Sequence, residues 1–522
     1  MSAGKAGTIL LAGISACVST SSEAKGSTED CKPNVIVILA DDLGYGDISC
    51  MNPDSKIPTP NIDALCNDGV RFTNAHAAST LSTPSRYGLM TGRYPWRTRL
   101  KQGAFNGYAR PLIESDVRTM AHLFSENGYS TACIGKWHLG MGWQYGAEDP
   151  SYKKSIMNGR SSGVDYKAGI TDGPTDHGFD YFFGLAGSLD MAPYAFVENK
   201  KMYTLPDHTI PKGQGLLLMH GGDAGEGFEP KDCLPEIFRR GTEYVNAARN
   251  SGKPFFLYLP ITAPHTPVLP HDEYIGKSGI GPYGDFVVMI DDLVGKLTAQ
   301  LEKNGQLENT IIVFTSDNGC APYVNIKDIE KKGHFPSYIY KGYKTDIYEG
   351  GHRMPLLISW KNHFDSAVRD CPVCLTDLYS TFAEMLGASL GDRDGVDSYS
   401  IWKILEGKAG KNSRKDIIYE SGNGFLSIYR DRYKLVFHPG SGGWGYPSKP
   451  EDLKGLPEFQ FFDLKNDPHE DNNLYPQMKD KAIIRKMTET IRGQILSGRS
   501  NAGAAVSNDT PADWNQIHKI VK

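Results

Sequence analysis

The sequence predicts an α/β fold: a large mixed, mostly parallel sheet sandwiched by helices, followed by a small C-terminal antiparallel sheet with one helix. Up to about Gly391, short apolar runs alternate with amphipathic stretches, which is typical of a parallel sheet covered by helices. Beyond Gly391, strand-like runs follow one another closely, which favours antiparallel pairing. We expect a leader over residues 1–31, a large α/β domain over 32–395 and a smaller α+β subdomain over 396–522.

The elements can be assigned in chain order. Short runs rich in β-branched or aromatic residues predict core strands over Asn34 to Ala40, Ser130 to Ile134, Pro254 to Leu259, Thr310 to Phe314 and Pro355 to Trp360. Amphipathic patterns predict helices over Ser115 to Asn127 (with Ser115 as the N-cap), Leu234 to Ala248, Phe286 to Lys303 and Leu375 to Leu386. The C-terminal elements are strands Phe425 to Tyr429 and Lys434 to His438 around an Arg-Asp-Arg turn, a strand Phe459 to Leu464, and a helix Ala482 to Leu496.

Composition excludes several classes of protein. The chain has 522 residues, 39% hydrophobic and 22% charged, which excludes disordered, collagen-like and coiled-coil chains. The net charge of -5 and the lack of a long basic run argue against a nucleic-acid partner. An anionic substrate would therefore be bound by a few placed Lys and Arg side chains.

The N-terminus resembles an export signal. The apolar stretch Thr8 to Ala16 is too short to span a bilayer, which takes about 18 apolar residues, and is typical of a signal h-region. Ile14 to Cys17 resembles a bacterial lipobox, in which Cys17 would be lipidated and become the mature N-terminus; ordinary cleavage nearby is the alternative. Both readings predict an exported protein, periplasmic or anchored as an outer-membrane or cell-surface lipoprotein, with membrane contact only through Cys17.

The cysteines predict no metal site. Nine cysteines are widely scattered, and an oxidising compartment would permit disulfides among them. Cys371 and Cys374 form a lone CxxC without a second pair, so we expect a local disulfide or buried thiols there and no zinc.

Polar residues follow directly after three predicted strands. Asp41 and Asp42 end the first, His265 follows Pro254 to Leu259, and Asp317 with Asn318 ends the strand that begins at Thr310. Ligands bind beyond the carboxyl ends of strands in open α/β sheets. The two Asp-containing pairs would then form an all-oxygen set that suits Ca²⁺ or Mg²⁺. Each pair is also a good turn sequence, so neither alone identifies a site.

A longer pattern carries a family resemblance. Ser82-x-Pro84-x-Arg86 followed by Thr91-Gly92-Arg93 resembles the signature of the formylglycine-dependent sulfatases of the alkaline phosphatase superfamily. Further elements of that family recur in order over nearly the whole chain: Asn34 to Asp47, Thr59 to Leu65, Gly135 to Gly140, His177 to Asp180, Ala263 to Pro267, Thr315 to Gly319, and Lys344 with Tyr348 to Gly351. For an isolated Ser-x-Pro, a simple N-cap serine would be the better interpretation. With the other elements present, Ser82 is the candidate catalytic residue.

The resemblance implies a mechanism and a set of roles. Residue 82, oxidised to formylglycine and hydrated, would attack sulfur, form a covalent sulfo-enzyme and then expel sulfate. Arg86 would hold this group near one Ca²⁺ bound by Asp41, Asp42, Asp317 and Asn318, with residue 82 as a further ligand. Lys136 and Lys344 would bind sulfate oxygens, His265 would protonate the leaving oxygen, and His138 would act as the base. Ser188 occupies the place of a supporting serine of the family, and Asp176 with His177 are further candidate substrate-binding residues.

One departure from the commoner pattern is that residue 82 is Ser and not Cys. The resemblance allows two explanations: a natural Ser-type enzyme matured by a radical, oxygen-independent maturase, or a substituted Cys-type enzyme that is never matured. The lipobox-like start favours a bacterial Ser-type enzyme. Unmodified Ser82 should leave the site folded and nearly inactive.

Three function classes remain. The leading hypothesis is a carbohydrate sulfatase, exo-acting on sulfated galactose or N-acetylgalactosamine units of glycans. The alternatives are a phosphonate or phosphate ester hydrolase of the same superfamily and a catalytically silent, sulfoglycan-binding lipoprotein. Sugar subsites are expected in loops over the rigid scaffold. The candidate loops are Asp176 with His177, Asp190 to Tyr194, residues 321–343, and Phe437 to Trp444.

Overall fold

The computed structural model describes residues 32–146 and 163–522. Residues Pro33–Lys522 group into one compact unit. The signal-peptide and lipobox assignments therefore lie outside the described residues, and the boundary near residue 396 stays a prediction. Among the described residues, no helix has the length and apolarity needed to cross a membrane.

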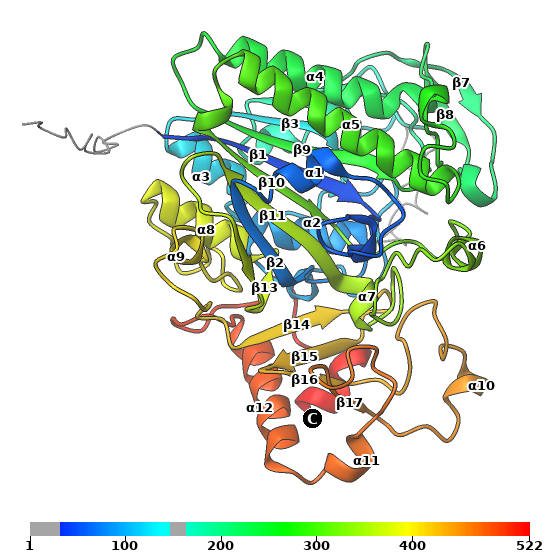
Figure 1. Cartoon of the computed structure of the whole chain (residues 1–522), viewed down its shortest axis with the longest axis vertical. Helices are drawn as coiled ribbons and strands as arrows, with labels where there is room; N and C mark the ends of the chain where they lie inside the picture. The colour runs from blue at the N-terminus through cyan, green and yellow to red at the C-terminus, as the bar shows by residue number, and fades with distance from the viewer. Residues whose placement is uncertain (1–31, 147–162) are drawn as a thin grey trace, which may run out of the picture. The chain divides into compact units, whose positions relative to one another are not determined.

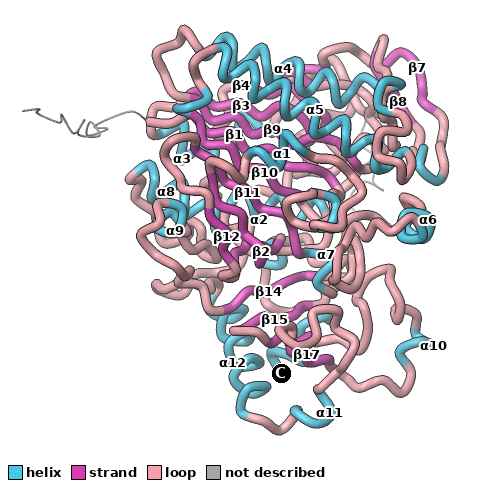
Figure 2. The backbone as a smooth tube through the Cα atoms, in the orientation of Figure 1, coloured by secondary structure: helices cyan, strands magenta, loops and turns pink. Residues whose placement is uncertain are grey.

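A large mixed sheet forms the centre of the unit, with helices on both faces (Figures 1 and 2). Its parallel core has the order β10-β1-β9-β3-β4, and antiparallel strands extend it on both sides. The predicted α/β class is confirmed. The strands are β1 (Asn34–Asp41), β2 (Gly69–His76), β3 (Ser130–Lys136), β4 (Tyr181–Leu185), β5 (Val197–Glu198), β6 (Lys201–Met202), β9 (Phe255–Pro264), β10 (Thr310–Ser316), β11 (Arg353–Trp360), β12 (Ala367–Arg369) and β13 (Val373–Cys374). A separate pair is formed by β7 (Pro206–Ile210) and β8 (Gly222–Gly225).

The parallel core strands are buried on both faces, which explains their nearly continuous apolar sequences. Every residue of β1 and β9 is buried. The helices α1 (Pro60–Ala64), α4 (Cys233–Ala248) and α5 (Pro282–Lys303) cover one face, and α2 (Ser82–Thr91), α3 (Met120–Glu126), α8 (Asp377–Leu386) and α9 (Trp402–Leu405) cover the other. The remaining helices are α6 (Ile326–Lys331), α7 (Glu349–His352), α10 (Pro450–Leu453), α11 (Tyr475–Met478), α12 (Ala482–Ser497) and α13 (His518–Val521).

The start of α3 corrects one expectation. The sequence placed the N-cap at Ser115, but α3 begins at Met120 with Thr119 as the N-cap. The Thr119 side chain accepts a hydrogen bond from the His122 backbone N–H, and the His122 ring in turn contacts the Thr119 backbone N–H. This reciprocal cap satisfies two N-terminal donors of the helix, so the helix starts there and not one turn earlier.

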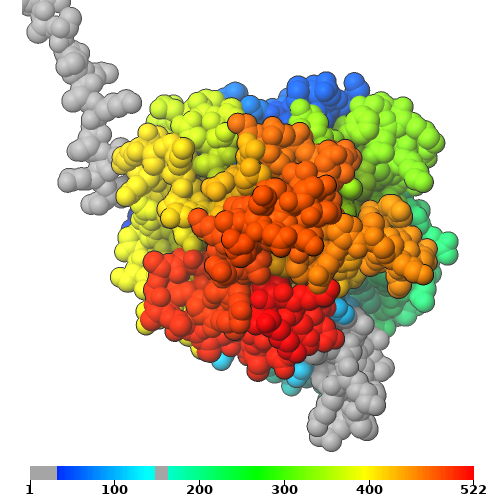
Figure 3. Space-filling model, turned by 90° about the horizontal axis from the view of Figure 1, so that it is seen from below, coloured from blue at the N-terminus to red at the C-terminus, as the bar shows by residue number. Residues whose placement is uncertain are grey.

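The C-terminal part forms an antiparallel sheet, as predicted, but with four strands where the sequence predicted three, since β14 was missed. Its order is β14 (Asp416–Glu420), β15 (Leu426–Arg430), β16 (Tyr433–Val436) and β17 (Gln460–Asp463). The hairpin between β15 and β16 turns through Asp431, which has φ 58°. Helix α12 packs against β15 through Ile484, Met487, Ile491 and Ile495. Figure 3 shows the C-terminal residues, orange to red, over much of the face seen from below.

The described cysteines are all free thiols. Cys371 and Cys374 are buried, so of the two expectations for this CxxC the structure has thiols and not a disulfide. The Sγ atoms of Cys50 and Cys66 lie 3.3 Å apart, which is a thiol contact without a covalent bond.

Candidate active site

The carboxyl ends of β1 and β10 bring the predicted oxygen ligands together. The two strands are parallel neighbours, with Ala40 paired to Ser316, so the residues that follow lie side by side. The Asp42 backbone N–H donates to Asp317 Oδ1 at 3.1 Å, and Asn318 Nδ2 donates to Asp42 Oδ1 at 2.7 Å. Asp42 has φ 64°, a strained conformation for a residue other than glycine. This strained conformation occurs where the chain turns at the end of β1, so that the carboxylates of Asp41 and Asp42 both point into the site.

Ser82 lies directly beside this set. Its hydroxyl donates to Asp41 Oδ1 at 3.2 Å and lies 3.4 Å from Asn318 Oδ1, and the side chain is buried. Ser82 is the first residue of α2 and therefore lies at a helix N-terminus. Pro84 is the third residue of α2. A proline is tolerated there because the first turn has no backbone acceptor for its missing N–H.

Three cations surround the three carboxylates. Arg86 stands one turn after Ser82 on the same face of α2, and its Nη2 lies 2.8 Å from Asp317 Oδ2. Lys136, the last residue of β3, places Nζ 2.8 Å from Asp41 Oδ2 and 3.3 Å from Ser82 Oγ. Lys344 Nζ lies 2.7 Å from Asp42 Oδ2. The three positive charges therefore balance the three negative charges of the buried carboxylates.

These ion pairs control the protonation of the site. Burial opposes ionisation of Asp41, but Lys136, His265 and Arg86 outweigh it and hold the pKa below its usual value. Burial would lower the pKa of Lys344, but Asp42 dominates and the pKa is raised. Burial lowers the pKa of Lys136 against the opposing effect of Asp41.

Two histidines border the same space. His138 Nε2 donates to the Phe105 carbonyl at 2.7 Å, and Nδ1 has no hydrogen-bond partner among residues 32–146 and 163–522. Burial and Lys136 place the pKa of His138 well below its ordinary value, so the ring is neutral with a free acceptor nitrogen. His265 Nδ1 donates to the Thr266 carbonyl at 2.7 Å, which directs Nε2 towards Asp42 Oδ2, 3.5 Å away.

A cavity of about 520 Å³ opens in front of these residues. Ser82, His138, His265, Lys344 and Ser188 all line it, and Ser188 Oγ lies 3.5 Å from His265 Nδ1. Three of the loops expected to carry sugar subsites contribute walls, through Asp190, Tyr323 and Trp444. His220 also lines the cavity, and nothing in its local sequence distinguished it.

The loop that carries Trp444 is bound next to Lys344. The Trp444 backbone N–H donates to Thr345 Oγ1 at 2.9 Å, and the Gly445 N–H donates to Asp346 Oδ1 at 2.7 Å. A wall from the C-terminal part is thus fixed by the two residues that follow Lys344.

Asp176 and His177 do not join this group. Asp176 pairs with Lys200 at 2.5 Å, and His177 Nε2 lies 2.9 Å from Asp172 Oδ1 while its ring stacks on Trp137. Neither lines the cavity. Their contacts stabilise the segment before β4, so the structure gives no support for a substrate-binding role.

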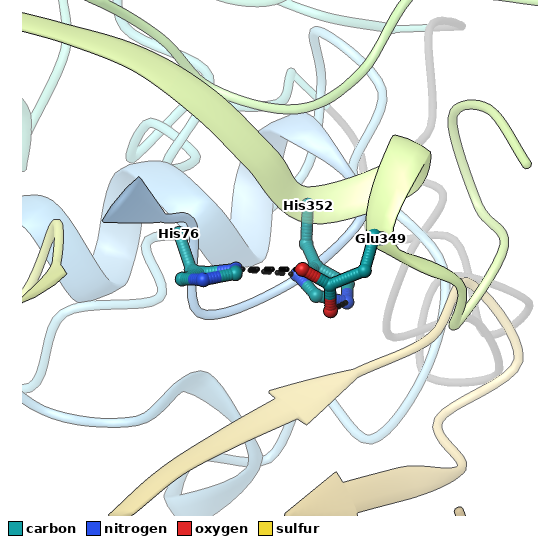
Figure 4. A group of neighbouring side chains, drawn as sticks. All are labelled: His76, Glu349 and His352. Atoms are coloured by element: carbon teal, nitrogen blue, oxygen red, sulfur yellow. Dashed lines mark hydrogen bonds and ion pairs between the residues drawn. The ribbon is translucent and has the colours of Figure 1, made fainter. Parts of the chain in front are cut away.

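A second buried cluster, His76, Glu349 and His352, has the residue types of a metal site (Figure 4). His76 Nε2 bonds to Asn74 Oδ1 at 2.7 Å, so its Nδ1 accepts from His352 Nδ1 at 3.1 Å. Lys434 Nζ lies 3.0 Å from His352 Nε2 and 3.1 Å from Glu349 Oε1. The ring nitrogens of both histidines are therefore already in hydrogen bonds, and two cations, Lys434 and Arg353 (3.0 Å from Glu349 Oε2), pair with Glu349. We therefore interpret the cluster as a joint between the two sheets.

The set around Ser82 fits a metal better. Three buried carboxylates and one amide at two adjacent strand ends offer only oxygen ligands, the chemistry of Ca²⁺ or Mg²⁺. Ligand atoms of Asp41, Asp42 and His265 lie within 4.8 Å of one another. The oxygens of this set converge beside Ser82, so the residues present fit a hard cation.

The chain is similar to known sulfatases. It is 31% identical to an N-acetylgalactosamine-6-O-sulfatase of Bacteroides thetaiotaomicron over 88% of this chain and 92% of that protein. It is 30% identical to human steryl-sulfatase over 76% of this chain and 74% of that protein. A structure from work on glycosaminoglycan metabolism by Bacteroides thetaiotaomicron superposes with a TM-score of 0.77 at 31% identity, covering 88% of this chain and 99% of that one.

The family model and the site agree. The model described as Sulfatase matches residues 33–388, which include every residue of the Ser82 cluster. This family depends on formylglycine and binds a metal, in keeping with the serine, the cations and the oxygen ligands described above. The chain belongs to the sulfatase family and is a sulfuric ester hydrolase.

Proposed function

We propose that the protein is an exo-acting carbohydrate sulfatase on galactose or N-acetylgalactosamine units of glycans, with the 6-O-sulfate of N-acetylgalactosamine as the first candidate. The relative named N-acetylgalactosamine-6-O-sulfatase supports this substrate class. The observation that carries the proposal is the position of Ser82, whose Oγ contacts Asp41, Asn318 and Lys136 at one end of a cavity of about 520 Å³. That volume lies in the range of small-molecule sites, about 300–1,000 Å³.

The proposal includes two groups that complete the site. A formylglycine-generating maturase oxidises Ser82, which thereby becomes able to supply the nucleophile for sulfur. One Ca²⁺, held by Asp41, Asp42, Asp317 and Asn318 with residue 82 as a further ligand, stabilises negative charge on the sulfate oxygens. The buried all-oxygen set supports this choice of cation.

The remaining side chains bind the sulfate and hold the reacting groups. Lys136 and Lys344 offer ammonium groups beside Ser82 and Asp42, so they can contact two different sulfate oxygens. Arg86 is held from two directions, because its guanidinium bonds to Asp317 and to the Lys136 carbonyl at 3.0 Å. It therefore fixes the distance between α2 and the end of β10.

Two proton transfers are assigned to the histidines. His265 donates a proton to the leaving sugar oxygen. Its Nδ1–H is bound to the Thr266 carbonyl, so Nε2, which faces the cavity side of Asp42, is the nitrogen that can donate. His138 accepts a proton at Nδ1, the nitrogen that has no partner among the described residues. Ser188 Oγ lies 3.5 Å from His265 Nδ1, the nitrogen that donates to the Thr266 carbonyl, and supports the orientation of the ring.

Export belongs to the proposal as well. The lipobox-like segment ending at Cys17 supports a periplasmic or cell-surface enzyme with a lipid anchor, whose partner is a sulfated glycan. An extracytoplasmic site gives the enzyme access to polymers that do not enter the cell.

Position-defined substrates test the proposal. We expect turnover of N-acetylgalactosamine 6-sulfate to exceed that of the 4-sulfate and of glucosamine 6-sulfate, with sulfate release measured by ion chromatography. Phenyl phosphonate monoesters and an aryl sulfate serve as parallel substrates. Higher activity on the phosphonate would favour the phosphonate hydrolase. Absence of turnover by protein shown to contain formylglycine would favour the silent, glycan-binding alternative.

A further inference from the structure

Two partly exposed thiols face each other beside α1. The Sγ atoms of Cys50 and Cys66 lie 3.3 Å apart, and neither side chain is fully buried. The sulfur atoms of a disulfide lie about 2.0 Å apart, so a movement of about 1.3 Å would join them. The other cysteines within residues 32–146 and 163–522 are all buried: Cys133, Cys233, Cys320, Cys371 and Cys374. Cys50 and Cys66 are therefore the described thiols that an oxidant in solution can reach.

The local fold holds the two cysteines together. Cys66 lies in the turn between α1 and β2, and its backbone N–H donates to the Asp63 carbonyl at 3.0 Å. The Cys50 backbone N–H donates to Asp63 Oδ1, also at 3.0 Å. Arg71, on β2, donates to the Cys50 carbonyl. Both cysteines are thus bound to Asp63, and both lie in turns, so the thiols can close the remaining gap without moving a helix or a strand.

The surroundings of the pair make one thiol the nucleophile. The contact with Cys50 lowers the pKa of the Cys66 thiol, and the Arg71 guanidinium adds to this effect against the opposing effect of burial. The same contact raises the pKa of Cys50. The thiolate is the attacking form in thiol–disulfide exchange, and reactive cysteines are typically partly exposed and next to a cation. Cys66 is therefore the attacking residue, and Cys50 is the residue that completes the reaction.

We propose that Cys50 and Cys66 form a disulfide when the folded protein meets a disulfide donor, such as oxidised glutathione or a thiol–disulfide oxidoreductase. The Cys66 thiolate attacks one sulfur of the donor and displaces the other as a thiolate. Cys50 then loses its proton and attacks Cys66 Sγ, which displaces the second donor sulfur. One S–S bond of the protein replaces two thiols, and the donor is reduced to two thiols.

The disulfide closes a loop that contains α1. This loop, residues 51–65, is already bound to α5, because the Ile62 backbone N–H donates to Asp291 Oδ1 at 2.8 Å. A cross-link of this kind stabilises the fold mainly by reducing the conformational freedom of the unfolded chain. Neither cysteine lines the cavity in front of Ser82, so the bond acts on stability and not on turnover. It does not depend on which ester the enzyme hydrolyses.

Peptide mapping tests the bond directly. Wild-type protein is incubated with oxidised or with reduced glutathione, then unfolded, alkylated and digested without reductant. With oxidised glutathione we expect a linked pair of peptides that contains Cys50 and Cys66 and is lighter by about two hydrogens than the sum of the reduced peptides. Alkylated thiols at both positions, a lasting glutathione adduct on the wild type, or a link from either residue to another cysteine would overturn the proposal.

Single variants separate the two roles. Cys50→Ser keeps the attacking thiol but not its partner, so Cys66 should accumulate as a mixed disulfide with glutathione. Cys66→Ser should form the adduct on Cys50 more slowly, because the contact of Cys50 with Asp63 favours the thiol form. Cys371→Ser is the matched control, since Cys371 is buried, and it should form the bond as the wild type does. A faster adduct on Cys50, or a Cys371→Ser protein that does not form the bond, would overturn the assignment.

Thermal unfolding measures the effect on stability. A closed loop of this length predicts a Tm about 3 °C higher for the oxidised than for the reduced wild type. The double variant Cys50→Ser/Cys66→Ser should have the same Tm in both buffers, and turnover of the wild type should be the same in both. A redox shift of Tm that persists in the double variant would assign the effect to other cysteines and overturn the proposal. Mapping and unfolding need no substrate, so both remain decisive if the proposed sulfatase specificity fails.

Discussion

Lys344 and Asp42 form a buried ion pair in which Nζ lies 2.7 Å from Oδ2. Asp42 stands at the end of β1, and Lys344 follows in the chain only after β10, so the pair joins two distant segments at the site. Because Asp42 is also a proposed metal ligand, a cation and the Lys344 ammonium share one carboxylate. Metal loading and sulfate binding should therefore depend on each other.

The first prediction concerns the metal. Asp317→Ala removes a ligand and the partner of Arg86, so both metal content and sulfatase activity should fall. Metal content is measured by inductively coupled plasma mass spectrometry after dialysis against Ca²⁺. The exposed Asp328→Ala is the control. Full occupancy and full activity in Asp317→Ala would remove Asp317 from the ligand set.

The second prediction concerns the general acid. His265→Ala should slow hydrolysis of sugar sulfates about 10²- to 10⁴-fold and affect an activated nitrophenyl sulfate far less. The reason is that an alkoxide needs a proton to leave, whereas a nitrophenolate does not. The ratio of kcat values on the two substrates is the measurement. Equal losses would assign His265 to binding or structure.

The third prediction concerns maturation. Active protein should carry an aldehyde at residue 82 that hydrazide reagents trap, with a mass about two hydrogens below that of serine. Ser82→Ala should abolish turnover and leave metal binding and the melting temperature close to wild type, since the hydroxyl makes only long hydrogen bonds, 3.2 Å to Asp41 and 3.4 Å to Asn318, and the other four proposed metal ligands remain. Full activity in a preparation that contains only unmodified serine would refute the mechanism.

The fourth prediction concerns the joint between the sheets. Lys434 pairs with Glu349 at 3.1 Å and with Glu470 at 2.9 Å, and all three side chains are fully buried. Lys434→Met leaves the buried Glu470 carboxylate without this cation and Glu349 with Arg353 alone, 3.0 Å away, and should destabilise the protein by about 3–5 kcal/mol. Thermal unfolding of this variant is compared with the exposed Lys465→Met. A loss of stability no larger than that of Lys465→Met would contradict this role of Lys434.

The sequence predicted the parts of the fold that follow simple periodicity. β1 and β9 are buried throughout, so their apolar runs identified them. β2 was missed because Arg71 and Asn74 interrupt its apolar pattern, and their partners, the Cys50 and Asp370 carbonyls, are distant or turn residues that no local pattern shows. The start of α3 was misplaced because Ser115 and Thr119 are equally good caps until the His122 contact is known.

The residues of the site likewise divide into those that the sequence predicted and those that it could not predict. Two neighbouring parallel strands end at the same edge of the sheet, so the residues that follow them converge. These residues are Asp41, Asp42, Asp317 and Asn318, and the order of the strands is enough to predict that they meet. Asp190 belonged to a candidate loop, but His220 could not be recognised, since its contact with Asp190 joins segments that only the folded chain brings together. His177 begins one of the family elements and Asp176 precedes it, yet their side chains make local contacts with Asp172 and Lys200 and do not line the cavity.

Because Trp444 is anchored beside Lys344, this wall of the cavity can form only late in synthesis of the chain. The pocket wall from residues 441–446 leaves the ribosome about a hundred residues after Thr345 and Asp346, which then bind it. Ser82 is 2% exposed once the chain has folded, so a maturase has no access to its hydroxyl in the finished enzyme. The proposed oxidation of Ser82 would therefore take place on the nascent or still unfolded chain, and slow folding of the C-terminal sheet would lengthen the time available for it.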